Sequence, residues 1–151
     1  MRKIILIPCC KSKCKKSKTK PVFAKDLYTG AGFKKCLKYA RTLTSDENIF
    51  ILSAKHHLLR LEDEVKWYDK CLKNVNAEEK RQWAAIVNRK LQQVSDLKKD
   101  KYIILAGKDY YLNLLDERVN EHISCYEIPM EGLRQGPRLH WLDEHTKGDK
   151  L

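Results

Sequence analysis

Short apolar runs alternate along this chain with longer segments in which apolar residues recur every three or four positions. Four runs predict buried strands, at residues 2–8, 48–53, 101–107 and 123–128. The first is almost continuous in aliphatic residues and ends at Pro8, which is typical of a parallel strand buried on both faces. The pattern therefore predicts a sheet whose strands are separated in sequence by helices.

Between the predicted strands, apolar residues recur with the spacing of a helix. The strongest helix begins at Asn76, because Glu79 follows three residues later as in a capping box. Its apolar residues keep a helical period: Trp83, Ile86, Val87, Leu91 and Val94. Further helices are expected at residues 28–43, through Leu112 and Leu115, and after Gly136-Pro137. The polar stretch at residues 9–20 predicts a loop without a helix.

Strands and helices in alternation predict a single α/β domain over residues 1–151, with a basic loop at residues 9–25. We expect a three-layer sandwich, with a mostly parallel, four-stranded sheet between helices and right-handed crossovers. Ligands of such sheets bind outside the carboxyl ends of the strands. The loops expected to converge there are residues 9–28, 53–69, 107–111 and 129–138.

The composition agrees with one ordinary domain. Of the 151 residues, 42% are hydrophobic and 34% are charged, which excludes disordered and collagen-like classes. No apolar run approaches the roughly 18 residues of a membrane span, and residues 4–8 are too short for a signal peptide. We expect a soluble, cytoplasmic protein with no membrane contact and no obligate protein partner.

Six cysteines are expected to be free thiols in that reducing compartment. Only Cys10 and Cys14 approach the spacing of zinc ligands, and no second pair completes a site. The sequence therefore predicts neither a metal nor another cofactor.

Positive charge is concentrated at one end of the chain. The net charge is +11, yet residues 1–41 hold 13 basic residues against one acidic residue, and residues 42–151 hold 18 against 19. One basic segment in an otherwise balanced chain is typical of a nucleic-acid binder, whereas a solvated basic face is the plainer alternative. We therefore expect a polyanionic partner.

The segment after the first strand, Cys9 to Lys13, brings backbone amides, a hydroxyl and ammonium groups close together, which suits a phosphate. A P-loop pattern is absent, so nucleotide hydrolysis has no support. Cys9 is either a nucleophile activated by neighbouring lysines or a packed thiol.

Three carboxylates and one histidine pair are candidates for acid–base chemistry. Asp26 precedes a predicted helix, where a helix cap is the alternative explanation. Asp69 follows Trp67-Tyr68, so a stacking surface adjoins a carboxylate, although a core aromatic and a surface acid would give the same pattern. Glu131 lies beside glycines near the chain's end. Ser53-Ala54-Lys55-His56-His57 follows a buried strand, and at most one of the tandem histidines should reach the crevice.

Six segments together resemble a known family in the same order along the chain. They are Pro-Cys-Cys-Lys-Ser-Lys at 8–13, Asp-Leu-Tyr-Thr-Gly at 26–30, Leu-Ser-Ala-Lys-His-His-Leu-Leu at 52–59, Tyr-Asp at 68–69, Ala-Gly-Lys-Asp-Tyr-Tyr at 106–111 and Pro-Met-Glu-Gly-Leu at 129–133. This set resembles the short proteins related to YaaA and, more faintly, the catalytic domain of archaeosine synthase and uracil-DNA-glycosylase-like folds. Two departures are His57, where the pattern has glycine, and Cys10, where serine is usual.

The resemblance implies a three-layer α/β domain that acts on DNA or on modified bases. A glycosylase would flip a nucleotide out, stack its base on Tyr28 or Tyr68, and hydrolyse the glycosidic bond. The oxocarbenium-like sugar then needs a carboxylate, for which the order of preference is Asp69, Asp26 and Glu131. Lys55 or His56 would stabilise charge on the departing base. Substrate and DNA contacts are expected from Cys9, Lys11, Ser12, Lys13, Lys15, Lys16, Tyr28, Ser53, Tyr68, Tyr110 and Arg138.

The function expected on these grounds is that of a monofunctional DNA glycosylase. It would excise a modified base, with defence against phage that carry modified DNA as the expected role. Two alternatives stay open: a non-catalytic, YaaA-like DNA-binding stress protein, and a transferase that modifies a deazaguanine or tRNA.

Overall fold

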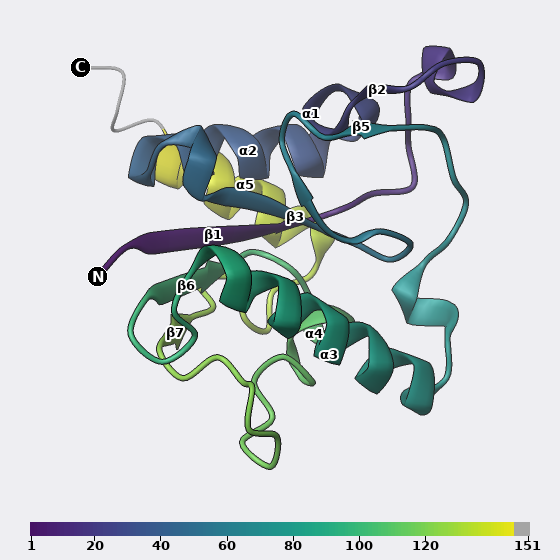
Figure 1. Cartoon of the computed structure of the whole chain (residues 1–151). Helices are drawn as coiled ribbons and strands as arrows, with labels where there is room; N and C mark the ends of the chain where they lie inside the picture. Colours follow the sequence, from purple (N-terminus) through teal and green to yellow (C-terminus); the bar gives the residue numbers. More distant parts are fainter. Residues whose placement is uncertain (147–151) are drawn as a thin grey trace.

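Five strands form the central sheet in the computed structural model, which describes residues 1–146 (Figure 1). In spatial order they are β4 (His57–Arg60), β3 (Ile49–Ser53), β1 (Lys3–Pro8), β6 (Lys101–Ile104) and β7 (Tyr126–Glu127). Strand β1 pairs in parallel with β3 and β6, and β6 pairs in parallel with β7. The prediction of a mostly parallel α/β sheet is therefore confirmed. The last five residues of the expected domain, 147–151, lie outside the described part.

The expected number of four strands is wrong, because residues 57–60 fold back as an additional, antiparallel strand. Leu58 and Leu59 pair with Leu52 and Ile51 of β3. Two adjacent leucines after a polar stretch are too short an apolar segment to predict a strand from the sequence. The predicted strand at 123–128 is shorter than expected, since β7 has only two residues.

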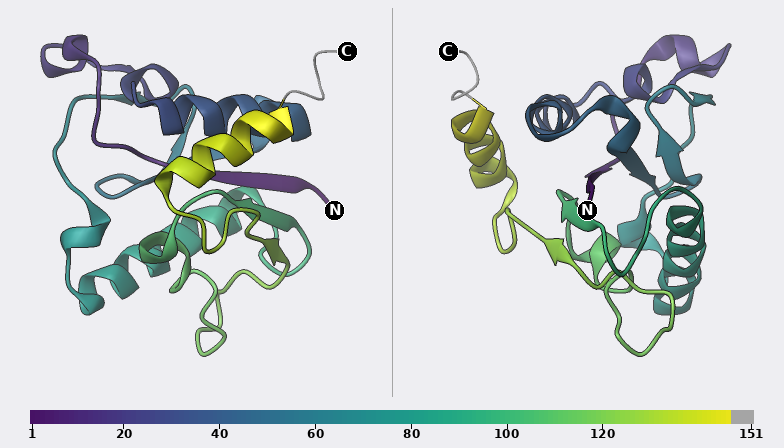
Figure 2. Two further views of the ribbon diagram at one scale, coloured as in Figure 1. Left: turned by 180° about the vertical axis from the view of Figure 1, so that it is seen from behind. Right: turned by 60° about the vertical axis from the view of Figure 1, so that its left-hand side comes forward.

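Helices cover both faces of this sheet (Figure 2). Helices α2 (Ala31–Leu43) and α5 (Gln135–Thr146) pack against each other on one face. The other face carries α3 (Ala77–Val94) and the single turn α4 (Lys108–Tyr111). Among residues 1–146, no helix combines the length and apolar character needed to cross a bilayer.

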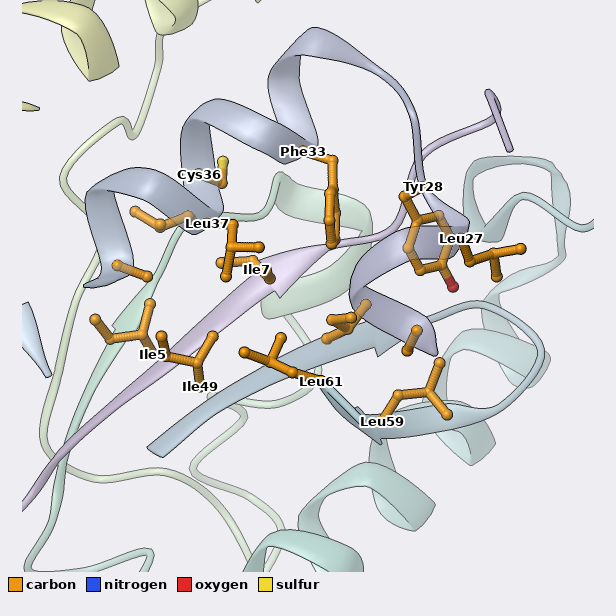
Figure 3. Close-up of a cluster of buried hydrophobic side chains, with 14 of the residues drawn as sticks. Ile5, Ile7, Leu27, Tyr28, Phe33, Cys36, Leu37, Ile49, Leu59 and Leu61 are labelled. Atoms are coloured by element: carbon orange, nitrogen blue, oxygen red, sulfur yellow. The ribbon is translucent and has the colours of Figure 1, made fainter. Parts of the chain in front are cut away.

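Strand β1 anchors the core on both faces. Ile5 and Ile7 belong to the apolar cluster on the α2 side (Figure 3), and Ile4 and Leu6 belong to the cluster around Trp83 of α3. All four of these side chains are fully buried. Burial of each stabilises the fold by about 1.5–3 kcal/mol, so the end of β1 and the loop that follows it start from a rigid position.

The helix starts follow from capping chemistry. The Asn76 side chain accepts a 2.8 Å hydrogen bond from the backbone N–H of Glu79, as predicted for α3. Gly30 occupies the cap position of α2. The alternative explanation of Asp26 as a helix cap is wrong, because this residue lies within the short helix α1 (Ala24–Leu27).

A small lobe beside the sheet carries part of the basic segment. It consists of α1, the antiparallel pair β2 (Val22–Phe23) and β5 (Glu64–Val65), and the 3₁₀ helix η1 (Lys15–Lys18). The expectation of a helix-free loop at residues 9–20 is therefore wrong. The buried Ser17 explains the difference, because its hydroxyl donates to the Cys14 carbonyl (2.6 Å) and its own carbonyl accepts from the Trp67 N–H (3.0 Å).

One residue of the β3–β4 hairpin has a backbone conformation that favours glycine. His57, the first residue of β4, has φ = 67°. A side chain in this left-handed region costs about 1–2 kcal/mol. The glycine expected at this position from the YaaA-like pattern is thus the residue that the hairpin geometry favours.

We predict that His57→Gly gives a more stable protein than His57→Ala, by about 1 kcal/mol, in chemical denaturation. Both variants lose the imidazole, so the difference between them measures the left-handed strain minus the entropic cost of glycine. At Arg60, in the same strand, the order should reverse, because glycine is disfavoured in an ordinary strand. Equal stability of the two His57 variants would contradict the prediction.

Candidate functional site

A cleft of about 390 Å³ opens where loops meet beyond the carboxyl end of β1. We call it the Asp69 cleft; its lining residues are Cys9, Cys10, Lys11, Lys13, Asp69, Lys70, Cys71, Asn74 and Tyr110. They come from the segment after β1, from the connection between β5 and α3, and from α4. Parts of three of the four loops expected to converge therefore do so.

The fourth loop lies at a second, smaller hollow of about 110 Å³ that shares Cys9 and Cys10 with the cleft. Met130 and Arg138 line this hollow. Arg138 is held there, because its Nε donates a 2.8 Å hydrogen bond to the Leu133 carbonyl. The four loops thus surround the end of β1 but line two adjoining hollows.

Positive charge dominates the Asp69 cleft. Lys11, Lys13 and Lys70 line it, and among its described lining residues Asp69 is the sole carboxylate. Lys70 also pairs with Glu79 at 2.9 Å, so Lys11 and Lys13 are the two cleft lysines for which the described chain shows no ion pair. A cleft of this kind can hold a phosphate group next to a single negative charge.

Aromatic rings orient Lys13. Its Nζ lies 4.4 Å from the centroid of the Tyr68 ring and 5.9 Å from that of Tyr28. The same Nζ donates a 3.3 Å hydrogen bond to the Lys11 carbonyl. Cation–π contacts contribute about 0.5–1 kcal/mol at partly exposed sites, so these rings favour one position of the ammonium group.

Behind Lys13, three buried hydroxyl groups form a hydrogen-bonded chain. The Tyr28 and Tyr68 hydroxyls are 2.6 Å apart, and the Tyr68 hydroxyl lies 2.9 Å from Oγ of Ser53. Ser53 Oγ also accepts a 3.0 Å hydrogen bond from the His56 N–H. Burial is the main factor that raises the pKa of both phenols, so both stay protonated at neutral pH.

This burial corrects the expected role of the two tyrosines. Tyr28 and Tyr68 are only 1% and 3% exposed, so neither ring offers a free face on which a flipped base could stack. Ser53 is fully buried as well and cannot contact DNA directly. The three residues instead support Lys13 and the chain segment that carries Asp69.

We predict that Tyr68→Phe lowers the free energy of unfolding by about 1–3 kcal/mol, because the Tyr28 and Ser53 hydroxyls lose their shared buried partner. Urea unfolding measures the change. Tyr126→Phe is the matched control, since Tyr126 is 49% exposed and should shift stability by less than about 0.5 kcal/mol. Equal effects of the two substitutions would show that the hydroxyl chain does not stabilise the fold.

Thiol groups form the floor of the cleft. Sγ of Cys9 lies 3.3 Å from the Tyr110 hydroxyl, and Sγ of Cys10 donates to the Ser12 carbonyl at 3.2 Å. Burial, followed by the proximity of Cys9, raises the pKa of Tyr110, and burial also raises that of Cys10. Within residues 1–146 no group of three or more His, Cys, Asp or Glu side chains is placed to hold a metal ion.

Comparison with known proteins identifies the family. The model of a family of unknown function, DUF6884, matches residues 4–144. The chain belongs to DUF6884. Neither the curated proteins nor the solved structures contain a match. The resemblance to YaaA-related proteins and to archaeosine synthase thus gains no support from these comparisons, and the function has to be argued from the site.

In this DUF6884 chain, the predicted catalytic residues do not gather in one place. Asp69 lines the cleft, whereas Asp26 is exposed on α1 and Glu131 accepts a 3.5 Å hydrogen bond from the Tyr111 hydroxyl. Lys55 is exposed in the β3–β4 turn. The His56 ring packs edge-on against Tyr68, with centroids 5.3 Å apart, and lines a different hollow.

The predicted substrate and DNA contacts divide in a similar way. The cleft brings together Cys9, Lys11, Lys13 and Tyr110. Ser12, Lys15 and Lys16 are exposed outside its lining, on the loop after β1 and on η1. A polyanion that enters the cleft could therefore meet further lysines beyond its rim.

Sequence reasoning missed Lys70, Cys71 and Asn74 as lining residues of this DUF6884 site. The loop predicted to converge there ends at residue 69, so these three residues lie outside it. A signal was present, because the segment between Asp69 and Asn76 has no apolar period and holds two lysines, a cysteine and an asparagine.

Proposed function

We propose that this chain is a DNA glycosylase that excises a flipped nucleobase in the Asp69 cleft. The observation that carries the proposal is a single carboxylate, Asp69, in a lysine-rich cleft of about 390 Å³ at the carboxyl end of β1. Pockets of about 300–1,000 Å³ accommodate small organic ligands, so one nucleotide unit fits this volume. The fold is proposed to be of the uracil-DNA-glycosylase type, related to YaaA.

The proposed reaction is hydrolysis of the N-glycosidic bond. The bond between the sugar C1′ and the base nitrogen breaks, and its electron pair leaves with the base, which takes up a proton. Water adds to C1′ and loses a proton, which yields an abasic site. The carboxylate of Asp69 would stabilise the oxocarbenium-like sugar or orient the attacking water.

Lysine side chains would supply the remaining electrostatic stabilisation. Lys11 and Lys13 would bind the phosphates that flank the flipped nucleotide. Lys13 is best suited to this role, since the Tyr68 ring orients its ammonium group. The earlier candidates for stabilising the departing base, Lys55 and His56, do not line the cleft.

The proposed substrate is DNA with a modified base, and the proposed role is defence against phage that carry such DNA. The lysines contact any phosphate, so selectivity would have to come from the cleft itself. If expression of the protein leaves infection by phage with modified DNA unchanged, the defence role is excluded while the chemistry remains open.

The direct test incubates the purified protein with DNA panels that carry ordinary and modified bases. Freed bases are measured by mass spectrometry, and abasic sites are revealed by alkaline cleavage. The proposal expects base release from one panel, with strand cleavage only after alkali. Tight, salt-sensitive binding without base release from any panel would overturn it and favour a non-catalytic DNA-binding protein.

A further inference from the structure

An exposed aromatic ring stands next to the Asp69 cleft. Trp67 is 40% exposed, which is unusual for a tryptophan, and it lies two residues before Asp69. In Figure 1 the segment that contains both residues runs down the right-hand side, from β5 towards the start of α3. Large exposed aromatic surfaces often mark binding sites, and here the neighbouring cleft is charged.

One lysine lies over this ring, and further lysines are exposed on the segments beside it. Nζ of Lys18 lies 5.2 Å from the centroid of the Trp67 ring, and Lys66 is exposed in the adjoining position. Lys15 and Lys16 are exposed on η1. The backbone N–H of Trp67 donates a hydrogen bond to the Ser17 carbonyl of η1, which holds the two segments together. We call this surface, Trp67 with Lys15, Lys16, Lys18 and Lys66, the Trp67 platform.

Tyr68 anchors the short chain segment between Trp67 and the Asp69 carboxylate. Trp67 and Asp69 are exposed, whereas Tyr68 between them is buried and fixed by the Tyr28 and Ser53 hydroxyls. Lys66 and Lys70 on either side are exposed as well, so Tyr68 is the buried anchor of this segment. Two residues of chain span at most about 7 Å, so the backbone at Trp67 lies about one nucleotide step from the backbone at Asp69.

We propose that Trp67 stacks on an unpaired base of DNA, next to the nucleotide whose sugar faces Asp69. Bases stack on aromatic side chains, while lysines track the backbone, and each base has a π-face, so such contacts tolerate any sequence. The inference rests on the proposed function for the nucleotide at Asp69. The inference adds that the DNA binds with at least one base unstacked next to the nucleotide at Asp69.

Binding measured without catalysis tests the platform. In an Asp69→Asn background, titration with single-stranded oligo(dT) should quench tryptophan fluorescence, and Trp67→Phe should remove most of this quenching. Trp83 is buried, and the half-buried Trp141 has one face stacked on His145, so Trp67 is the most exposed of the three tryptophans. In the same background, Trp67→Ala should weaken oligo(dT) binding about tenfold.

Phe23 provides the matched control. It is 42% exposed in the same lobe and, like Trp67, has a lysine, Lys25, over its ring. It differs in position, because it lies in the β2–β5 pair opposite Glu64, three residues before Trp67. Phe23→Ala should change oligo(dT) affinity less than twofold. Equal losses in the two alanine variants, unchanged quenching in Trp67→Phe, or tighter binding to oligo(rU) than to oligo(dT) would each overturn the inference. Quenching by Trp67 without base release from any panel would instead overturn the glycosylase and leave the platform standing.

Discussion

Asp69→Asn should reduce base excision by about 10²–10³-fold and change DNA affinity by less than threefold. The asparagine keeps the size of the side chain and removes its negative charge, which is the property that an oxocarbenium-like sugar requires. Because Asp69 is exposed and contributes no described ion pair, the substitution should not affect folding. Single-turnover base release and equilibrium DNA binding measure the two quantities.

The other two carboxylates are the controls for this prediction. Asp26→Asn and Glu131→Gln remove one negative charge each, as Asp69→Asn does, but neither residue lines the cleft. Both variants should retain base excision within about twofold. If either control loses base excision while Asp69→Asn retains it, the reaction does not take place in the Asp69 cleft. Equal losses of affinity and excision in Asp69→Asn would show that this residue binds DNA and is not catalytic.

Much of the fold could be predicted because the apolar pattern records burial on both faces of a parallel strand. Ile4 to Ile7 and Ile49 to Leu52 are buried on both sides, so their continuous apolar runs identify β1 and β3. Asn76 and Glu79 identify the start of α3 for a local reason, since the cap is made within four residues. These features depend on few distant contacts.

The missed strand and the misassigned tyrosines depend on distant contacts. Strand β4 is recognisable only once β3 lies beside it, because Leu58 and Leu59 are too few to show a period. Tyr28 and Tyr68 are 40 residues apart in the chain, and their hydroxyl contact turns two apparent stacking residues into buried supports. A tyrosine in a polar segment looks the same in sequence whether it faces solvent or another phenol.

The location of the candidate site could be predicted from the sequence, but the residues that line it could not. The rule that ligands bind at the carboxyl ends of parallel strands locates the segments after β1 and β6, and these meet the segment after β5 in one cleft. Which of the candidate carboxylates enters that cleft depends on the buried Tyr68, which places Asp69 there. Asp26 has no such anchor at the cleft and lies on α1.

The triple substitution Lys15→Gln, Lys16→Gln and Lys18→Gln should weaken DNA binding and flatten its salt dependence. Each lysine that neutralises a phosphate contributes about 0.7 (single strand) to 0.9 (duplex) to the slope of log K against log salt, so three contribute about 2–3. Between 50 and 200 mM salt, the affinity of the variant should change about 20- to 40-fold less than that of the wild type. Titrations at several salt concentrations measure this slope.

A charge-matched control separates local contact from the overall field of the protein. Lys34, Lys38 and Lys99 are exposed and distant in sequence from η1, and changing all three to glutamine lowers the net charge by the same amount. If the lysines of η1 contact phosphates, only their variant loses slope, because counterions are released where lysines and phosphates meet. Equal slopes of log K against log salt in the two triple variants would mean that DNA binding depends only on the net charge of the protein. The lysines of η1 would then not support the Trp67 platform. A reduced slope together with normal base release at saturating DNA would assign η1 to affinity and the Asp69 cleft to chemistry.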